Sequence, residues 1–467
     1  MSEMVNKNKR PFGFYICCVA FMFERMAYYS AKYLIFIFVA ATIVTGGLGL
    51  TKIEAALIQS NLVAFTYLAP IIGGYISDRF IGARYCVPVG LVLMAAGYFM
   101  GGSAVNVGGM TLMVVLVAVG TGLFKGNVSA INGSLFEDEN QLDSAFSVQY
   151  SFVNIGAFIG TTAVGILVAT TFAHGGVQGF RPAFQLCGLI CAIDAVWFLF
   201  GMKFLGDAGK KPFKAGKHTE KKVEAEVKPL TRVEKRKVFA IVLVSLFSVV
   251  FWVFWYLTYL AAYDYGGQFI NMNMSGFTVP LSWFDSLNSF VCIALGPVLA
   301  ALWFRMSKSA KGDMSLFKKL GLGLGFLGMS FLMLVFAELS RGGVATAKAS
   351  IIWLILFGIL LSMGEMFFSP LGNSFVTKHA PNKIYSVLMG VWILASFIAG
   401  KSYGYVYALA SSYPIMVSYV IIPVILFIAA ILLFVFDKKL IRLLEEETKS
   451  EEELIEERIT ESEYRLP

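Results

Sequence analysis

Charged residues are scarce in this chain of 467 residues. Asp, Glu, Lys and Arg together make up 15% of it, whereas soluble globular domains carry about 25%. Hydrophobic residues reach 57%, against about 45–50% in soluble domains, and the mean hydropathy is +0.72. This balance excludes an ordinary soluble domain and indicates an integral membrane protein.

Histidine is rarer still. His174, His218 and His379 are the three histidines, and none lies in a hydrophobic run. The six cysteines show no metal-ligand spacing with histidine, so we interpret them as small apolar residues. We find no nucleophile–base constellation, nucleotide-binding motif or metal-ligand set. The sequence therefore gives no basis for an enzyme, a metal centre or an organic cofactor.

What the chain has in abundance is hydrophobic runs of about 20 residues, long enough to cross a ~30 Å hydrocarbon core as helices. About twelve runs begin near residues 14, 53, 85, 108, 146, 183, 238, 282, 317, 350, 385 and 413. A Lys- and Glu-rich stretch without hydrophobic period divides them. We therefore predict an all-α membrane protein with two six-helix halves, 1–205 and 238–436, a cytoplasmic linker at 206–237 and an acidic cytoplasmic tail at 437–467.

Basic residues collect on one side of these runs. They follow runs two, six, eight and ten, and they include Arg79, Arg84 and a dense cluster between residues 203 and 237. By the positive-inside rule, both termini are predicted to be cytoplasmic in a multi-pass protein of the cell membrane, whether inner or plasma membrane. The same distribution accounts for the net charge of +8 and argues against nucleic-acid binding.

Several ionisable side chains lie inside the hydrophobic runs. Glu24, Arg25 and Lys32 fall in the first run, Lys125 in the fourth and Glu365 in the tenth. A charge near the bilayer centre costs about 2.5–3.5 kcal/mol by insertion scales, so such residues usually face a bundle interior or an aqueous cavity. The pattern predicts a polar, charged cavity and favours transport.

Two features resemble the major facilitator superfamily. One is the six-plus-six layout with a basic central loop, and the other is the segment GYISDRFIGAR at residues 74–84, which is similar to a loop motif of that superfamily. The resemblance implies a fold of about twelve transmembrane helices in two six-helix halves. Such halves rock around a site near the membrane midplane.

Five further stretches match the motifs of one family within that fold. The first run contains ERMAYY from Glu24, close to E-x-x-E-R-F-x-Y-Y, and the fourth contains GTGLFKGNVSAINGSLF around Lys125. The fifth contains QYSFVNIGAFIG, which matches F-Y-x-x-x-N-x-G through Asn154, and the eighth opens with SWFDSLNSF, close to W-F-Q-S-L-N-P. The tenth contains GEMFFSPLGNSFVTKHAP, which matches G-E-x-x-x-S-P-x-G. This ordered set resembles the proton-dependent oligopeptide transporter family.

The resemblance implies a secondary transporter of di- and tripeptides that works as a monomer in the lipid bilayer, with protons as the coupling ion. A short peptide is a zwitterion, so its site needs fixed cations for the carboxylate and a fixed anion for the ammonium. Arg25 and Lys125 supply the cations and Glu365 supplies the anion. The resemblance also implies that Lys125 and Glu365 approach each other across the halves, as a gate salt bridge on the cytoplasmic side.

The other candidate site residues offer hydroxyls, aromatic rings, amides and an apolar wall. The predicted substrate-binding residues are Arg25, Tyr28, Tyr29, Lys32, Tyr67, Lys125, Asn154, Tyr256, Asn288, Glu365, Trp392 and Ser396. Glu24 and Glu365 are the predicted proton-coupling residues. The alternatives are a structural pair of Glu24 with Arg25, and packing or helix-bridging roles for the aromatic and asparagine side chains.

The chain is an atypical member in this comparison because two family acids are missing. The first signature Glu would fall at position 21, where this chain has Phe21. A family acid of run seven is replaced by Tyr256 or, in the other register, by Tyr259. Proton coupling needs a carboxylate or histidine whose proton is exchanged against substrate or a salt bridge.

Lys32 holds the position of a family arginine that pairs with the second of these acids, so its usual partner is absent. Asp264 and Asp285 are the candidate substitutes. An uncoupled or exchanging carrier, or an exporter, of an amino acid, polyamine or related amine therefore stays open beside peptide transport. A non-transporting membrane receptor is the remaining alternative.

Overall fold

The computed structural model describes residues 10–136, 139–212, 230–309 and 314–463. Twelve long helices dominate this part of the chain. They are α1 (Phe12–Ala40), α2 (Lys52–Ile76), α3 (Ala83–Ser103), α4 (Val107–Ser134), α5 (Glu139–Ile166), α6 (Phe180–Gly201), α7 (Arg232–Phe269), α8 (Trp283–Ser307), α9 (Leu316–Ser340), α10 (Ile352–His379), α11 (Tyr385–Ser411) and α12 (Ile415–Glu463). Eleven of them are long and apolar enough to cross a membrane. The predicted set of about twelve membrane-spanning helices is confirmed.

The helix outside those eleven is α1. It is long enough to cross the membrane, with 29 residues, but it contains Glu24, Arg25 and Lys32. All three side chains are buried within the protein. The first helix therefore carries three charged residues inside the bundle.

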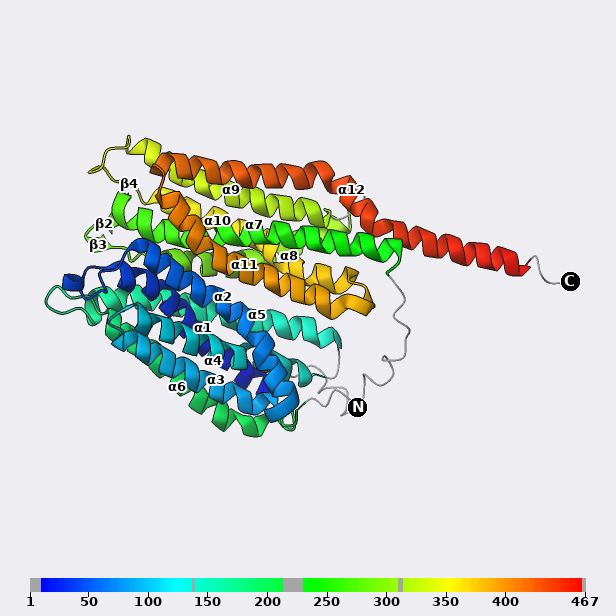
Figure 1. The fold of residues 1–467 in the computed structure, drawn as a ribbon, viewed down its shortest axis with the longest axis horizontal. Coiled ribbons are helices and arrows are strands. Elements are labelled where there is room, and N and C mark those ends of the chain that lie inside the picture. The colour runs from blue at the N-terminus through cyan, green and yellow to red at the C-terminus, as the bar shows by residue number, and fades with distance from the viewer. Residues whose placement is uncertain (1–9, 137–138, 213–229, 310–313, 464–467) are drawn as a thin grey trace.

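The first six helices lie side by side in one half of the molecule and α7 to α12 in the other (Figure 1). The halves pack against each other mainly through α2 with α11 and α5 with α8. Short single-turn elements join the long helices: η1 (Ile43–Thr45), η2 (Ser77–Ile81), η3 (Leu167–Thr171), η4 (Met202–Phe204) and η5 (Asn382–Ile384). The site described below lies where the two halves face each other.

The two ends of the bundle differ. At the end that we call the strand end, β1 (Ile270–Asn271) pairs in parallel with β4 (Ala349–Ser350), and β2 (Asn273–Met274) pairs antiparallel with β3 (Phe277–Thr278). At the opposite end, which we call the terminus end, α1 begins and α12 leaves the bundle (Figure 1).

Two boundaries differ from those predicted. Helix α7 begins at Arg232, inside the predicted linker, because Thr231 and Glu234 form a capping box that starts the helix there. Most of the rest of that linker, residues 213–229, lies outside the described residues. Helix α12 runs on past residue 436 without a break, and Asp437 is buried and 3.2 Å from the Lys318 ammonium. The C-terminal bundle therefore extends beyond its predicted end.

Glycines allow helices of the first half to approach closely. A Cβ atom placed on Gly122 of α4 would lie 2.6 Å from the carbonyl oxygen of Ala69 on α2. One turn later, a Cβ atom on Gly126 would meet nothing within 4 Å. Small residues at helix contacts let membrane helices pack backbone to backbone, so these two glycines of one helix have different structural roles.

We expect Gly122→Ala to destabilise the protein by about 1–3 kcal/mol, because the added methyl group overpacks the contact between α2 and α4. Gly126→Ala is the matched control, and it should be neutral or gain up to about 1 kcal/mol from helix propensity. Thermal unfolding of the purified variants measures the difference. Equal melting temperatures for both variants would contradict the close approach of α2 and α4.

Candidate functional site

A cavity of about 290 Å³ lies between the two halves, and we call it the central cavity. Helices α1, α2, α4 and α5 line it from the first half, and α7, α8 and α10 line it from the second. A second cavity of about 490 Å³ shares part of this lining and extends toward the terminus end, where α11 joins its wall. The site is thus placed between the halves and continues toward one end of the bundle.

The structure brings most of the predicted substrate-binding residues together. Ten of them line the central cavity, namely Arg25, Tyr28, Tyr29, Lys32, Tyr67, Lys125, Asn154, Tyr256, Asn288 and Glu365. Trp392 and Ser396 line the second cavity instead, nearer the terminus end. Glu24 lines neither cavity, because its carboxylate is fully buried against Arg25.

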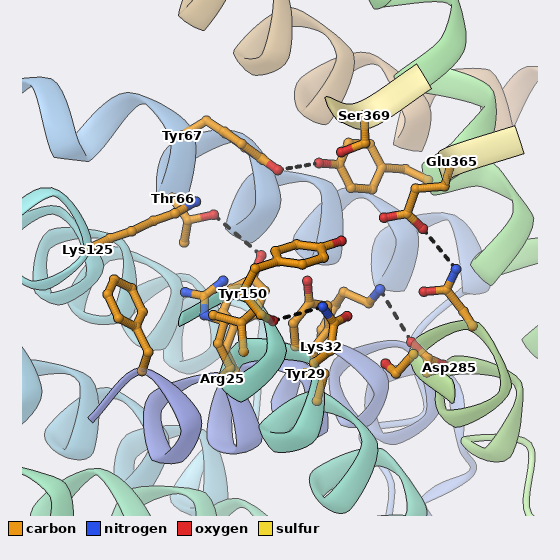
Figure 2. A pocket seen from close by; sticks show the side chains of 18 of the residues that line it. Arg25, Tyr29, Lys32, Thr66, Tyr67, Lys125, Tyr150, Asp285, Glu365 and Ser369 are labelled. Atoms are coloured by element: carbon orange, nitrogen blue, oxygen red, sulfur yellow. Dashed lines mark hydrogen bonds and ion pairs between the residues drawn. The ribbon is translucent and has the colours of Figure 1, made fainter. Parts of the chain in front are cut away.

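Charges of opposite sign occupy opposite walls of the central cavity. Arg25 and Lys32 of α1 and Lys125 of α4 are the lining cations, and all belong to the first half. Asp285 of α8 and Glu365 of α10 are the lining carboxylates, and both belong to the second half. Figure 2 shows these side chains pointing toward one another from the two halves. The cavity therefore has a strong dipole across the interface between the halves.

Arg25 is held by its neighbour in the sequence. Its Nε and Nη2 donate to the two carboxylate oxygens of Glu24 at 2.5 and 2.6 Å. The guanidinium also lies 4.5 Å from the ring centroid of Tyr28, whose hydroxyl is 3.4 Å from Thr66 Oγ1. The ion pair with Glu24 neutralises Arg25 on the side away from the cavity. The guanidinium still lines the cavity, where it can bind an anion.

Lys125 and Glu365 make no ion pair with each other within the described part of the chain. The Lys125 ammonium lies 4.9 Å from the ring centroid of Tyr67. Glu365 accepts a hydrogen bond from Asn288 Nδ2 at 2.9 Å and a weaker one from Cys292 Sγ at 3.6 Å. These groups are uncharged, so this conformation leaves one cation and one anion without an ionic partner on opposite walls. The predicted gate salt bridge stays a prediction for another conformation.

Lys32 does have an acidic partner. Its ammonium lies 3.4 Å from Asp285 across the interface between α1 and α8, and the two side chains are 4% and 3% exposed. Tyr263 donates its hydroxyl to the other Asp285 oxygen at 2.6 Å, and the Lys32 ammonium lies 3.6 Å from the ring centroid of Tyr259. Of the two candidate substitutes, Asp285 is therefore the partner of Lys32.

Asp264, the other candidate, lies farther toward the strand end. It pairs with Lys52 of α2 at 2.5 Å and accepts a hydrogen bond from Tyr407 at 2.7 Å. This second ion pair also joins the halves, but the side chains of Lys52 and Asp264 are 45% and 23% exposed.

Hydroxyl and amide groups add further bonds between the halves. Ser286 of α8 lies 2.8 Å from Thr161 Oγ1 and 2.9 Å from Thr162 Oγ1 of α5. Tyr403 of α11 donates to Gln59 of α2 at 3.1 Å. Together with the two ion pairs, these bonds close the central cavity toward the strand end. The structure is therefore a conformation with its access on the terminus side.

The two residues that replace family acids are engaged in uncharged contacts. Phe21 lines the central cavity and packs edge-to-face against Phe124, with ring centroids 5.4 Å apart. Tyr256 donates its hydroxyl to Tyr67 at 2.9 Å. Neither position carries a charge that could exchange a proton near neutral pH.

Sequence reasoning missed part of the lining. It left Asp285 as one of two options, and it did not assign the aromatic side chains Trp252 and Trp255 of α7 or Gln149 and Tyr150 of α5. The α7 residues were detectable, because Trp252, Trp255, Tyr256 and Tyr259 recur at helical spacing along one face.

Known proteins resemble this chain over most of its length. A sequence model described as the POT family matches residues 85–223 and 214–422. The chain is 27% identical over 437 residues to "Uncharacterized transporter YclF" of Bacillus subtilis (strain 168), covering 83% of this chain and 86% of that protein. It is 26% identical over 435 residues to a "Di-/tripeptide transporter" of Lactococcus lactis subsp. cremoris, covering 80% and 84%.

Solved structures match over nearly the whole chain. The crystal structure of peptide transporter POT in complex with sulfate has a TM-score of 0.82 at 24% identity and covers 93% of this chain and 96% of that one. A POT family transporter in complex with 5-aminolevulinic acid has a TM-score of 0.82 at 23% identity, covering 92% and 97%. These likenesses confirm the predicted major facilitator fold. Since the family model spans most of the sequence as well, the chain belongs to the POT family.

Proposed function

We propose that the protein carries small zwitterionic peptides, chiefly di- and tripeptides, across the cell membrane. The observation that supports this most directly is the pair of unmatched charges, Lys125 and Glu365, on opposite walls of one cavity. A peptide carboxylate would bind Lys125 and Arg25, and the peptide ammonium would bind Glu365. Asn154 and Asn288 would bond the peptide backbone whatever its side chains. The name of the Lactococcus lactis relative supports the same substrate class.

Alternating access follows from two halves that meet around one site. The strand end is closed here and the second cavity extends toward the terminus end, so the structure represents one side of the cycle. We place the terminus end in the cytoplasm because the basic residues of the chain gather there. The protein would then act as a monomer in the lipid bilayer of the cell membrane, with both termini inside.

We further propose that protons are the coupling ion and that Asp285 is one of the groups that bind them. A proton on Asp285 removes the charge that holds Lys32, and this pair joins α1 to α8 at the closed end of the cavity. Glu24 and Glu365 remain coupling candidates. Arg25 can leave Glu24 for a substrate carboxylate, and substrate or Lys125 can approach Glu365, so each carboxylate exchanges its partner during the cycle.

One observation favours a second function, a carrier that exchanges or equilibrates another small solute such as an amino acid, polyamine or related amine. Phe21 and Tyr256 occupy the positions of two acids and are engaged in uncharged contacts. In that case protons would not drive accumulation, although the dipolar cavity would still bind a zwitterion.

Replacing Lys125 or Glu365 by Ala tests the proposed site. Each loses a charge-assisted contact worth about 1.5–3 kcal/mol, so labelled dipeptide uptake into proteoliposomes should fall by roughly tenfold or more. Lys348→Ala is the control, because Lys348 is exposed near the strand end and its charge is lost without touching the cavity. If both cavity variants take up the dipeptide at the rate of the unaltered protein, at equal protein content, the proposed site is wrong.

The ion pair between Lys32 and Asp285 is tested by stability. Asp285→Ala leaves Lys32 buried without its partner and should cost about 3–5 kcal/mol. Asp264→Ala breaks the partly exposed pair with Lys52 and should cost about 1 kcal/mol or less from the ion pair itself. Thermal unfolding of the purified proteins compares them.

The double variant Lys32→Met with Asp285→Leu removes both buried charges. It should recover most of the stability lost in Asp285→Ala, because apolar groups of similar size avoid the unpaired charge. If Asp285→Ala has the same melting temperature as the unaltered protein, the ion pair does not hold the halves together.

A further inference from the structure

We infer that the central cavity selects peptides by side-chain charge, accepting neutral and acidic side chains and excluding basic ones. This inference rests on the proposed transport of zwitterionic peptides. It is carried by the distribution of charge between the two walls and by the partners that each charge already has.

Among the described residues, the cavity offers a peptide one free carboxylate. Of the two lining acids, Asp285 is engaged by the Lys32 ammonium at 3.4 Å and by the Tyr263 hydroxyl at 2.6 Å. Glu365 has only uncharged donors, so it is the group available to the peptide ammonium. A lysine or arginine side chain on the same peptide would bring a second positive charge and find no second free acid.

The opposite wall makes this mismatch worse. The charged residues of the first half that line the cavity in the described part of the chain are cations, and Glu24, which neutralises Arg25, lies outside the lining. Phe21 lies one helical turn before Arg25 and is packed against Phe124, so this part of the wall is apolar. A basic side chain turned toward the first half would therefore meet like charges, and among the described residues it would find only uncharged acceptors such as Gln149 and Asn154 in place of a carboxylate.

Aromatic faces are the other place where a cation could bind. In α7, two of these rings already lie near a cation, because the Lys32 ammonium is 3.6 Å from the ring centroid of Tyr259 and 5.9 Å from that of Trp255. The Trp255 ring also packs edge-to-face with Trp252 and Tyr256, with ring centroids 5.2 and 5.1 Å apart. A second cation at the Tyr259 or Trp255 ring would therefore meet the charge of Lys32.

An acidic side chain meets the reverse situation. Lys125 has no ionic partner in the described part of the chain, and the Arg25 guanidinium faces the cavity beside it. Glu24 takes Nε and Nη2 of Arg25, which leaves Nη1 of the guanidinium to donate toward the cavity. Lys125 and Arg25 Nη1 can therefore bind two carboxylates, the terminal one and that of an Asp or Glu side chain. The described lining thus offers donors for a second carboxylate but no second free carboxylate for an ammonium.

Equilibrium competition binding tests this selectivity without a membrane potential. The full-length protein in nanodiscs, near pH 7, is titrated against labelled Ala-Ala with two matched pairs of dipeptides. Ala-Lys is compared with Ala-norleucine, which has nearly the same shape without the charge, and Ala-Glu is compared with Ala-Gln. We expect Ala-Lys to bind about tenfold or more weakly than Ala-norleucine, and Ala-Glu to bind at least as tightly as Ala-Gln.

Equal affinity for Ala-Lys and Ala-norleucine, with Ala-Ala bound normally, would overturn the inference and leave the proposed function standing. Failure of every dipeptide, Ala-Ala included, would overturn the proposed function and the inference together.

A gain of binding provides the second test. Phe21→Glu adds a carboxylate to the wall that lacks one, and it should bring the affinity for Ala-Lys to within about threefold of that for Ala-norleucine. Phe21→Gln has the same shape without the charge and should keep the full discrimination. An unchanged ratio in a folded Phe21→Glu protein that still binds Ala-Ala would show that wall charge does not set the selectivity.

Discussion

The structure depends on one constraint, which is that a charge buried within a membrane protein needs a partner. Lys32 and Asp285 satisfy it for each other across the two halves, at 3.4 Å and almost without exposure. Because the partners lie on α1 and α8, the pair can exist only while the halves meet at the strand end. A local requirement of two side chains thereby becomes a constraint on the conformation of the whole molecule.

In the central cavity, three of the lining charged side chains have ionic partners among the described residues and two, Lys125 and Glu365, do not. Arg25 is matched by Glu24 and Lys32 by Asp285, whereas Lys125 and Glu365 are matched by neither each other nor any other described ionic group. A zwitterion supplies both missing charges at once. The charges that would bind substrate and the ion pair that closes the cavity therefore line the same cavity, which is the physical basis for coupling a solute or a proton to movement of the halves.

Much of this architecture could be predicted from sequence because its causes are local. Runs of about 20 apolar residues located the helices, and the ionisable residues within them located the cavity, since such residues face an interior or a cavity. The start of α7 and the end of the C-terminal bundle were harder to predict. A capping box at Thr231 starts α7, and the buried contact of Asp437 with Lys318 carries the bundle past residue 436; neither changes the hydrophobic period.

The partner of Lys32 could not be predicted, because Asp264 and Asp285 are both far from it in sequence. The choice depends on which faces of α7 and α8 turn toward α1 once all helices are packed. The same holds for Glu24, whose side chain turns away from the cavity although its neighbour Arg25 lines it. Orientation around a helix axis is a tertiary property, and it decides roles that residue type leaves open.

The central claim is that the ion pair between Lys32 and Asp285 links the protonation of the carrier to its conformation. The most direct test is accumulation of a labelled dipeptide in proteoliposomes under an acid-outside pH gradient, comparing the unaltered protein with Asp285→Asn. The account predicts that the unaltered protein concentrates the dipeptide above equilibrium, whereas Asp285→Asn only equilibrates it. Accumulation by Asp285→Asn to the same level as the unaltered protein would contradict the claim.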